Sequence, residues 1–260
     1  MRYAIHRLEE LSWIEATSAI PNSVALLPLG AIEAHGPHLP LNTDLLISEE
    51  ITRRAAERLV ADRSVVILPS IAYGVSYVGT CFAGTTPAPP TALIQLITEV
   101  LVTTLDRGAD AAIIINSHLE PAHTAAVAEA RERAAGATQK PVAFPDIREP
   151  RWAARLSQEF RDGMRHAGSY ETSLILAAHP NLVRRDMLSS LEPVLVDLPA
   201  ALKAGARYFD EAGGTLGYFG NPAQATAEEG ELMFAALVSI VIDALSDIES
   251  HSNPSNHTSP

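Results

Sequence analysis

Several kinds of residue are scarce in this 260-residue chain, and each scarcity excludes a class of protein. Cys81 is the only cysteine, so the chain can form neither an internal disulfide nor a cysteine-based zinc cluster. Basic residues number 19 against 31 acidic ones, giving a formal net charge of −12, so we predict no nucleic-acid partner. The sequence contains no uncharged apolar run of about 18 residues, which argues against a membrane span.

The N-terminus also lacks the features of a secretory signal. Residues 1–13, MRYAIHRLEELSW, carry charges where a signal peptide needs an apolar segment. Only two lysines occur, Lys140 and Lys203, and neither belongs to a P-loop, so phosphate chemistry of that kind is excluded. We therefore expect a cytoplasmic, acidic, globular protein with one large domain.

Short apolar runs alternate with longer helical patterns along the chain. Strands are predicted at Ser23–Leu29, Ser64–Leu68, Ala111–Ile115, Pro141–Phe144 and Pro193–Val196. Helices are predicted at Leu45–Val60, Thr91–Arg107, Ala122–Ala135 and Gln224–Ile248, the last with a break near Gly230. This alternation predicts a three-layer α/β domain and leaves open whether its sheet is wholly parallel.

The C-terminal residues 250–260 differ in composition from the rest of the chain. They read SHSNPSNHTSP, with two prolines and no large apolar side chain. Such a segment cannot bury enough surface to offset the entropy lost on ordering. We predict one domain over residues 1–249 and a disordered tail over residues 250–260.

The segment GAIEAHGPHLPLNTD, residues 30–44, directly follows the first predicted strand. Glu33 and His35 are two residues apart, so in an extended segment their side chains point the same way, and Asp44 follows after a stretch able to fold back. Two carboxylates and an imidazole suit a divalent metal. The alternative is a polar surface loop with solvated histidines, but ligands in α/β folds gather at the carboxyl ends of strands.

A second segment, NSHLEP at residues 116–121, follows the strand predicted at Ala111–Ile115 and repeats the two-residue spacing with His118 and Glu120. The two segments would converge if their strands are neighbours. The five candidate ligands are then enough for two metals that share one carboxylate: Glu33, His35, Asp44, His118 and Glu120.

The segment HAGSYETS, residues 166–173, allows two interpretations. In one, Glu171 is a helix-entry carboxylate favoured by the helix dipole, and His166 lies on the surface. In the other, His166 is a proton donor that Glu171 orients. Among the remaining residues, we predict that Cys81 is a small packed side chain and not a nucleophile.

These segments together resemble the creatininase family of metal-dependent amidohydrolases. The matching pieces occur in family order and span about 200 residues: GAIEAHGPHLPLNTD at 30–44, GVS at 74–76, FAGT at 82–85, NSHLEP at 116–121, HAGSYETS at 166–173 and GNPAQATAEEG at 220–230. The resemblance implies a three-layer αβα sandwich, a homo-hexamer and two divalent ions, zinc or manganese or both, with iron as a further possibility.

The resemblance also implies roles for individual residues. Glu33 resembles a ligand of one metal and His35 of the other, with Asp44 bridging them. His118 matches a further ligand, and Glu120 matches the glutamate of the creatininase branch. The catalytic histidine and its supporting glutamate correspond to His166 and Glu171.

The chain departs from the family pattern where substrate is contacted. Creatininases place a tryptophan shortly before the catalytic histidine, whereas this chain has RDGM at residues 161–164. Trp152 lies upstream and is the candidate for that role, while Ser76 is a second candidate substrate contact. Ser117 and Pro121 replace the glycine and asparagine usual around the metal-binding histidine.

The resemblance implies hydrolysis of a small cyclic or linear amide at a non-peptide C–N bond, by a water that two metal ions activate. Rival activities within the family are formamide hydrolysis in flavin-related biosynthesis and peptide trimming. A rival of another class is a metal-free structural or ligand-binding subunit, although such a protein has no physical need for three clustered carboxylates.

Overall fold

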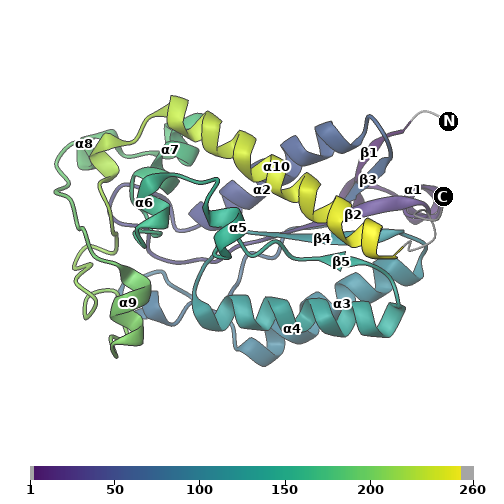
Figure 1. The fold of residues 1–260 in the computed structure, drawn as a ribbon, viewed down its shortest axis with the longest axis horizontal. Helices are drawn as coiled ribbons and strands as arrows, with labels where there is room; N and C mark the ends of the chain where they lie inside the picture. Colours follow the sequence, from purple (N-terminus) through teal and green to yellow (C-terminus); the bar gives the residue numbers. More distant parts are fainter. Residues whose placement is uncertain (1–2, 253–260) are drawn as a thin grey trace, which may run out of the picture.

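A computed structural model describes residues 3–252, in which five strands form one parallel sheet of order β1–β3–β2–β4–β5 (Figure 1). The strands are β1 (Ile5–Arg7), β2 (Ser23–Leu29), β3 (Ser64–Ile67), β4 (Ala111–Asn116) and β5 (Val142–Ala143). Leu29 pairs with Asn116, so β2 and β4 end side by side at the centre of the sheet. The predicted strands over Ser23–Leu29, Ser64–Leu68 and Ala111–Ile115 are therefore confirmed.

Helices cover both faces of this sheet (Figure 1). On one face lie α2 (Thr43–Leu59), α7 (Ser169–Ala178) and α10 (Ala227–Ser252), and on the other α3 (Pro90–Asp106) and α4 (Pro121–Thr138). Alternate residues of β2 point to opposite sides, since Val24 and Leu26 join one apolar cluster while Ala25 and Leu27 join the other. The predicted three-layer αβα architecture is confirmed.

Short helical segments complete the chain. They are η1 (Leu8–Glu10), α1 (Trp13–Ala19), η2 (Val78–Cys81), α5 (Pro150–Ala153), α6 (Gln158–Arg161), η3 (Pro180–Leu182), α8 (Arg185–Leu188), α9 (Leu198–Lys203) and η4 (Pro222–Gln224). The helices α6, α8 and α9 lie at the same end of the molecule, on the left in Figure 1. No helix within residues 3–252 combines the length and apolar character needed to cross a bilayer.

The structure differs from the sequence predictions in two strands and at Cys81. Strand β1 was not predicted, because three partly exposed residues at a sheet edge carry almost no apolar pattern. Residues Pro193–Val196 form no strand; Val194 makes only an isolated antiparallel bridge with Gly220. Cys81 is exposed and not packed, because it ends a short helical turn at the surface.

The C-terminal helix also corrects the prediction. Helix α10 passes through Gly230 without a break and extends to Ser252. A Cβ atom on Gly230 would lie 2.0 Å from the carbonyl oxygen of Ser173 in α7, so this glycine permits close helix packing. Of the predicted tail, residues 253–260 lie outside the described residues.

Candidate metal centre and active site

The ends of β2 and β4 position the candidate ligands. The loop after β2 carries Glu33 and His35 and leads into α2, whose first turn carries Asp44. A Cβ atom on Gly30 would lie 2.5 Å from the backbone nitrogen of Leu45, so the glycine lets α2 start directly against the end of β2. His118 follows β4 by two residues and reaches the same place because the two strands are neighbours.

Asp44 lies between two histidines that come from different strands. Its Oδ1 is 3.2 Å from Nε2 of His35, and its Oδ2 is 3.2 Å from Nδ1 of His118. All three side chains are buried. Each oxygen of one carboxylate therefore faces a different imidazole, as expected for a carboxylate that bridges two cations.

Backbone carbonyls fix which nitrogen of each histidine faces the centre. Nδ1 of His35 is 3.1 Å from the Glu33 carbonyl oxygen, Nε2 of His118 is 2.7 Å from the Val75 carbonyl oxygen, and Nε2 of His166 is 2.8 Å from the Ala34 carbonyl oxygen. Because a carbonyl only accepts hydrogen bonds, each of these nitrogens must carry the proton. The opposite nitrogens of these rings are left to bind a cation or a proton.

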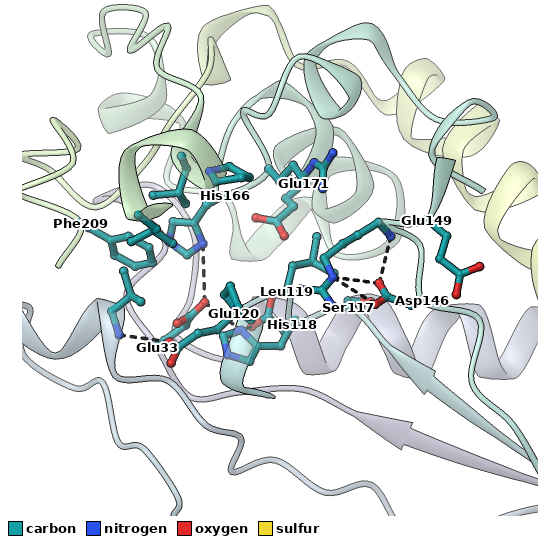
Figure 2. A pocket seen from close by; sticks show the side chains of 18 residues that line it. Glu33, Ser117, His118, Leu119, Glu120, Asp146, Glu149, His166, Glu171 and Phe209 are labelled. Carbon is teal, nitrogen blue, oxygen red and sulfur yellow. Dashed lines mark hydrogen bonds and ion pairs between the residues drawn. The ribbon is translucent and has the colours of Figure 1, made fainter. Parts of the chain in front are cut away.

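Glu33 and Glu171 complete the buried cluster. Glu33 Oε1 is 3.2 Å from Nδ1 of His118 and 3.5 Å from Nδ1 of His166, while Glu171 Oε2 is 3.7 Å from Nε2 of His35. Three groups of possible ligand atoms lie within 4.8 Å of one another: Glu33, Asp44 and His118; His35, Asp44 and Glu171; Glu33, His35 and His166. Figure 2 shows four of these side chains, Glu33, His118, His166 and Glu171, around the same part of the cavity.

The donor set fits divalent metals. Two ligand atoms on one tetrahedral Zn²⁺ lie roughly 3.4 Å apart, because each bond is about 2.0–2.2 Å, and the 3.2 Å separations at Asp44 match this. Asp44 Oδ2 is buried and its close polar neighbour is Nδ1 of His118, so while that nitrogen carries no proton the oxygen has no hydrogen-bond donor among the described residues. Within residues 3–252, the ion pairs of Glu33, Asp44 and Glu171 all go to histidines, so no lysine or arginine balances these charges.

The pKa values of the buried groups also show that this centre favours positive charge. Burial alone would lower the pKa of His35, but Asp44 and Glu171 raise it to about 10. The pKa of His118 is likewise raised, despite burial, chiefly by Glu33. Burial raises the pKa of Glu171 to about 8, with Asp44 adding to the effect. Without a metal, protons therefore occupy the place between carboxylates and imidazoles that cations can take.

His166 differs from the other two histidines. Burial, reinforced by His35, lowers its pKa to about 4, so its imidazole is neutral at pH 7 with Nδ1 free to accept a proton. Its ring stacks on Phe209, with centroids 4.2 Å apart. The described contacts of Glu171 do not include His166; Glu171 instead accepts a hydrogen bond from the Ala167 amide at 2.6 Å.

The structure brings four of the five predicted ligands together and leaves one apart. Glu120 lines the same cavity, but its carboxylate accepts a hydrogen bond from the Val78 amide at 3.1 Å and belongs to none of the three ligand groups. Glu171, predicted as a supporting residue, instead belongs to a group of possible ligands with His35 and Asp44. Helix α7 carries Glu171 to the centre over the same sheet face that α2 covers.

The two predicted substrate contacts have other surroundings. Ser76 is buried and donates a hydrogen bond from Oγ to Glu33 Oε2 at 2.5 Å, so it holds a candidate ligand in place. Trp152 is buried in the apolar cluster beneath α10 and does not line the cavity. The tryptophan of the family pattern thus has no counterpart at this cavity within the described residues.

His123 belongs to none of the motifs in the sequence, yet the structure places it beside a candidate ligand, with its ring centroid 4.6 Å from that of His118. It is buried, accepts a hydrogen bond at Nδ1 from the Val75 amide, and has Nε2 2.9 Å from Asn116 Oδ1. Because the Val75 carbonyl accepts a hydrogen bond from His118, His123 helps to fix the residue that orients this candidate ligand. The sequence indication of this contact is that His123 follows Asn116, the last residue of β4, by seven positions.

A cavity of about 400 Å³ opens onto the centre (Figure 2). Its floor includes Glu33, Asp44 and His118, and its walls include the apolar side chains of Leu198, Leu202 and Phe209. Arg148 and Arg165 also line it. A small organic ligand of ordinary size fits a cavity of this volume, with polar groups gathered at one end.

The fold and the site define an α/β protein with a candidate two-metal centre at the carboxyl ends of its central strands. The family described as "Creatininase: Creatinine amidohydrolase" matches residues 9–245. Creatinine amidohydrolase of Pseudomonas putida is 30% identical over 264 residues, covering 91% of this chain and 94% of that protein. The chain belongs to the creatininase family.

Other relatives carry a different activity in their names. The mycofactocin precursor peptide peptidase of Mycolicibacterium smegmatis is 32% identical over 228 residues, covering 85% of this chain and 84% of that protein. This chain is therefore similar to hydrolases of both kinds, and the predicted restriction to non-peptide bonds is not established.

Solved structures support the fold. A creatinine amidohydrolase (creatininase) superposes with a TM-score of 0.71 at 24% identity, covering 95% of this chain and 98% of that one. A manganese form of creatininase and a mutant of Zn–Zn type give TM-scores of 0.69 and 0.70, each at 23% identity. They cover 94% and 92% of this chain and 98% and 96% of theirs.

Proposed function

We propose that this chain is a metal-dependent amidohydrolase that uses two divalent cations to hydrolyse a C–N bond of a small cyclic or linear amide. The observation that supports this most directly is Asp44, whose two oxygens face His35 and His118 from opposite sides. Glu33, Asp44 and His118 would hold one cation, and His35, Asp44 and Glu171 the other. Zn²⁺ and Mn²⁺ are the preferred candidates, because mixed imidazole and carboxylate sets suit both.

Two bound cations would supply Lewis acidity, polarising the substrate carbonyl and lowering the pKa of a water molecule. The neutral His166 then accepts the proton of the attacking water at Nδ1 and passes it to the leaving amide nitrogen. Its Nε2–H remains hydrogen-bonded to the Ala34 carbonyl throughout, and the stacked Phe209 ring holds the imidazole plane. Ser76 keeps Glu33 oriented toward the centre.

Peptide trimming is a second candidate within this chemistry. It is supported by the 32% identity to a peptide peptidase and by the absence of a tryptophan from the cavity lining of the described chain. Apolar walls from Leu198, Leu202 and Phe209 suit an amino-acid side chain as well as a small ring. Creatinine remains a substrate to be tested beside short peptides.

The test is metal removal followed by reconstitution. Chelation should abolish hydrolysis, and Zn²⁺ or Mn²⁺ should restore it at about two ions per chain, measured by elemental analysis and by assays on creatinine, cyclic ureides, formamides and short peptides. Glu129→Gln, on the exposed face of α4, is a suitable control because it changes charge far from the centre. A chain that binds no metal, or hydrolyses none of these amides when loaded, would be a binding subunit instead.

A further inference from the structure

Two arginines line the cavity, and they are engaged differently. Arg148 forms a two-pronged ion pair with Asp146, with Nη2–Oδ2 at 2.6 Å and Nε–Oδ1 at 2.9 Å. Its positive charge is therefore matched by a neighbouring carboxylate. Figure 2 shows Asp146 held in this way at the wall of the cavity.

Arg165 forms no ion pair with a carboxylate among the described residues; Asp197 and Asp146 act on its pKa only from a greater distance. Its Nε donates to the Phe160 carbonyl at 2.9 Å, and its guanidinium lies 4.7 Å from the centre of the Phe160 ring. These contacts hold the side chain, but its two terminal nitrogens make no hydrogen bond to any residue in the range 3–252. The side chain is half-buried at the cavity, so an unused pair of donors is already positioned there.

The chemistry of this position favours a carboxylate. A guanidinium presents parallel N–H groups that match the two oxygens of a carboxylate, and the pair gains strength beside apolar walls such as Leu198 and Leu202. A phosphate dianion is less suitable, because only one unmatched positive charge is present and Asp146 and Glu149 line the same cavity. One free guanidinium therefore suits one singly charged anion.

Arg165 also lies next to the reacting groups. It immediately precedes His166, and both side chains line the cavity that contains Asp44 and Glu171. An anion bound at Arg165 would therefore belong to the same molecule whose amide reaches the metal centre. Creatinine, which carries no carboxylate, would leave this arginine unused.

We propose that Arg165 binds the carboxylate of the substrate, so that the preferred substrates are amides bearing a free carboxylate, such as N-acyl amino acids or the C-terminal ends of peptides. This inference rests on the proposed amide hydrolysis and names its substrate class. Arg165 is a specificity-determining residue in this assignment, and the proton transfer stays with His166.

The experiment compares matched substrates on the metal-loaded protein. A short peptide and its C-terminal amide form one pair, and an N-acetyl amino acid and its N-methylamide form the other, so that the two pairs separate peptide ends from acyl amino acids. The free acid of the favoured pair should have a kcat/KM about 10- to 100-fold above its neutral partner, the usual value of a charge-assisted hydrogen bond. In Arg165→Gln this preference should disappear, mainly through KM, and Arg165→Lys should restore part of it.

Arg133→Gln is the matched control, because Arg133 is an exposed arginine of α4 that pairs with Glu129 outside the cavity. It should leave the preference unchanged. Metal content and melting temperature of every variant separate a binding effect from lost packing on Phe160. If Arg165→Gln is unstable, the test relies on the preference of the wild-type protein for free acids and on the Arg165→Lys variant.

Two outcomes would overturn the inference while leaving the proposed function intact. One is equal hydrolysis of free acids and their neutral partners, or of creatinine, by the wild-type protein. The other is a preference that survives in Arg165→Gln while all rates fall together. Failure of the loaded protein to hydrolyse any amide would instead remove the proposed function, and this inference with it.

Discussion

Asp44 is the residue on which the proposed two-metal arrangement depends, because each of its oxygens faces a different histidine. Asp44→Asn should therefore bind close to no metal, whereas Glu171→Gln should lose the ion held with His35 and keep the other. Elemental analysis after dialysis against the metal gives the number of ions per chain for both variants. Equal stoichiometry in the two variants would mean that Asp44 does not bridge or that Glu171 is not a ligand.

A variant of His166 tests the chemical step separately from metal binding. His166→Ala should retain both metals and lose about 10²- to 10⁴-fold in turnover, because removing a proton-transfer group typically costs that much. The loss should shrink for amides with good leaving groups, which need less protonation of their nitrogen. Normal turnover with both metals retained would end the catalytic assignment, and loss of one metal would make His166 a ligand.

At the scale of secondary-structure elements, the contact between α7 and α10 holds Glu171 in place. Gly230→Ala should destabilise the protein by about 1–3 kcal/mol, because the added methyl would meet the Ser173 carbonyl and force the helices apart. Gly136→Ala in α4 is the control: its added Cβ would meet no atom within 4 Å outside the neighbouring backbone of its own helix, so it should stabilise the protein by about 0.4–1 kcal/mol.

Denaturant unfolding of the two glycine variants gives both free energies of unfolding. Metal titration of Gly230→Ala adds a second measurement, since displacement of α7 should weaken the site that includes Glu171 more than the site that includes His118. A neutral effect of Gly230→Ala on stability would show that the two helices can separate without cost.

For the whole molecule, the family resemblance leads us to expect a homo-hexamer. Light scattering should give a mass of six chains, and a mass of one chain would contradict this expectation. Apolar side chains are exposed far from the cavity, including Trp13 at 80% and Leu232 at 67%, which is compatible with contact between subunits. Metal removal in the same experiment shows whether assembly depends on the centre.

The sequence by itself determined the sheet core and the positions of the first candidate ligands. Val24–Leu29 and Ala111–Ile115 are apolar throughout, and such runs are typical of buried parallel strands in an α/β domain. Glu33, His35 and His118 sit within six residues of these strand ends, so local geometry carries them to one edge of the sheet. The short strand β1 at the edge of the sheet was not predicted, because its few residues show little apolar pattern.

Only the tertiary structure decided which other groups meet those ligands. Spacing favoured Glu120, yet the Val78 amide holds its carboxylate to the side, and Glu171 reaches the centre because α7 packs on the sheet. Phe209 stacks on His166 across more than 40 residues of sequence, and Trp152 turns into the core. Side-chain spacing fixes which residues share a local face, whereas partners distant in sequence are chosen by how whole elements pack, which no local pattern encodes.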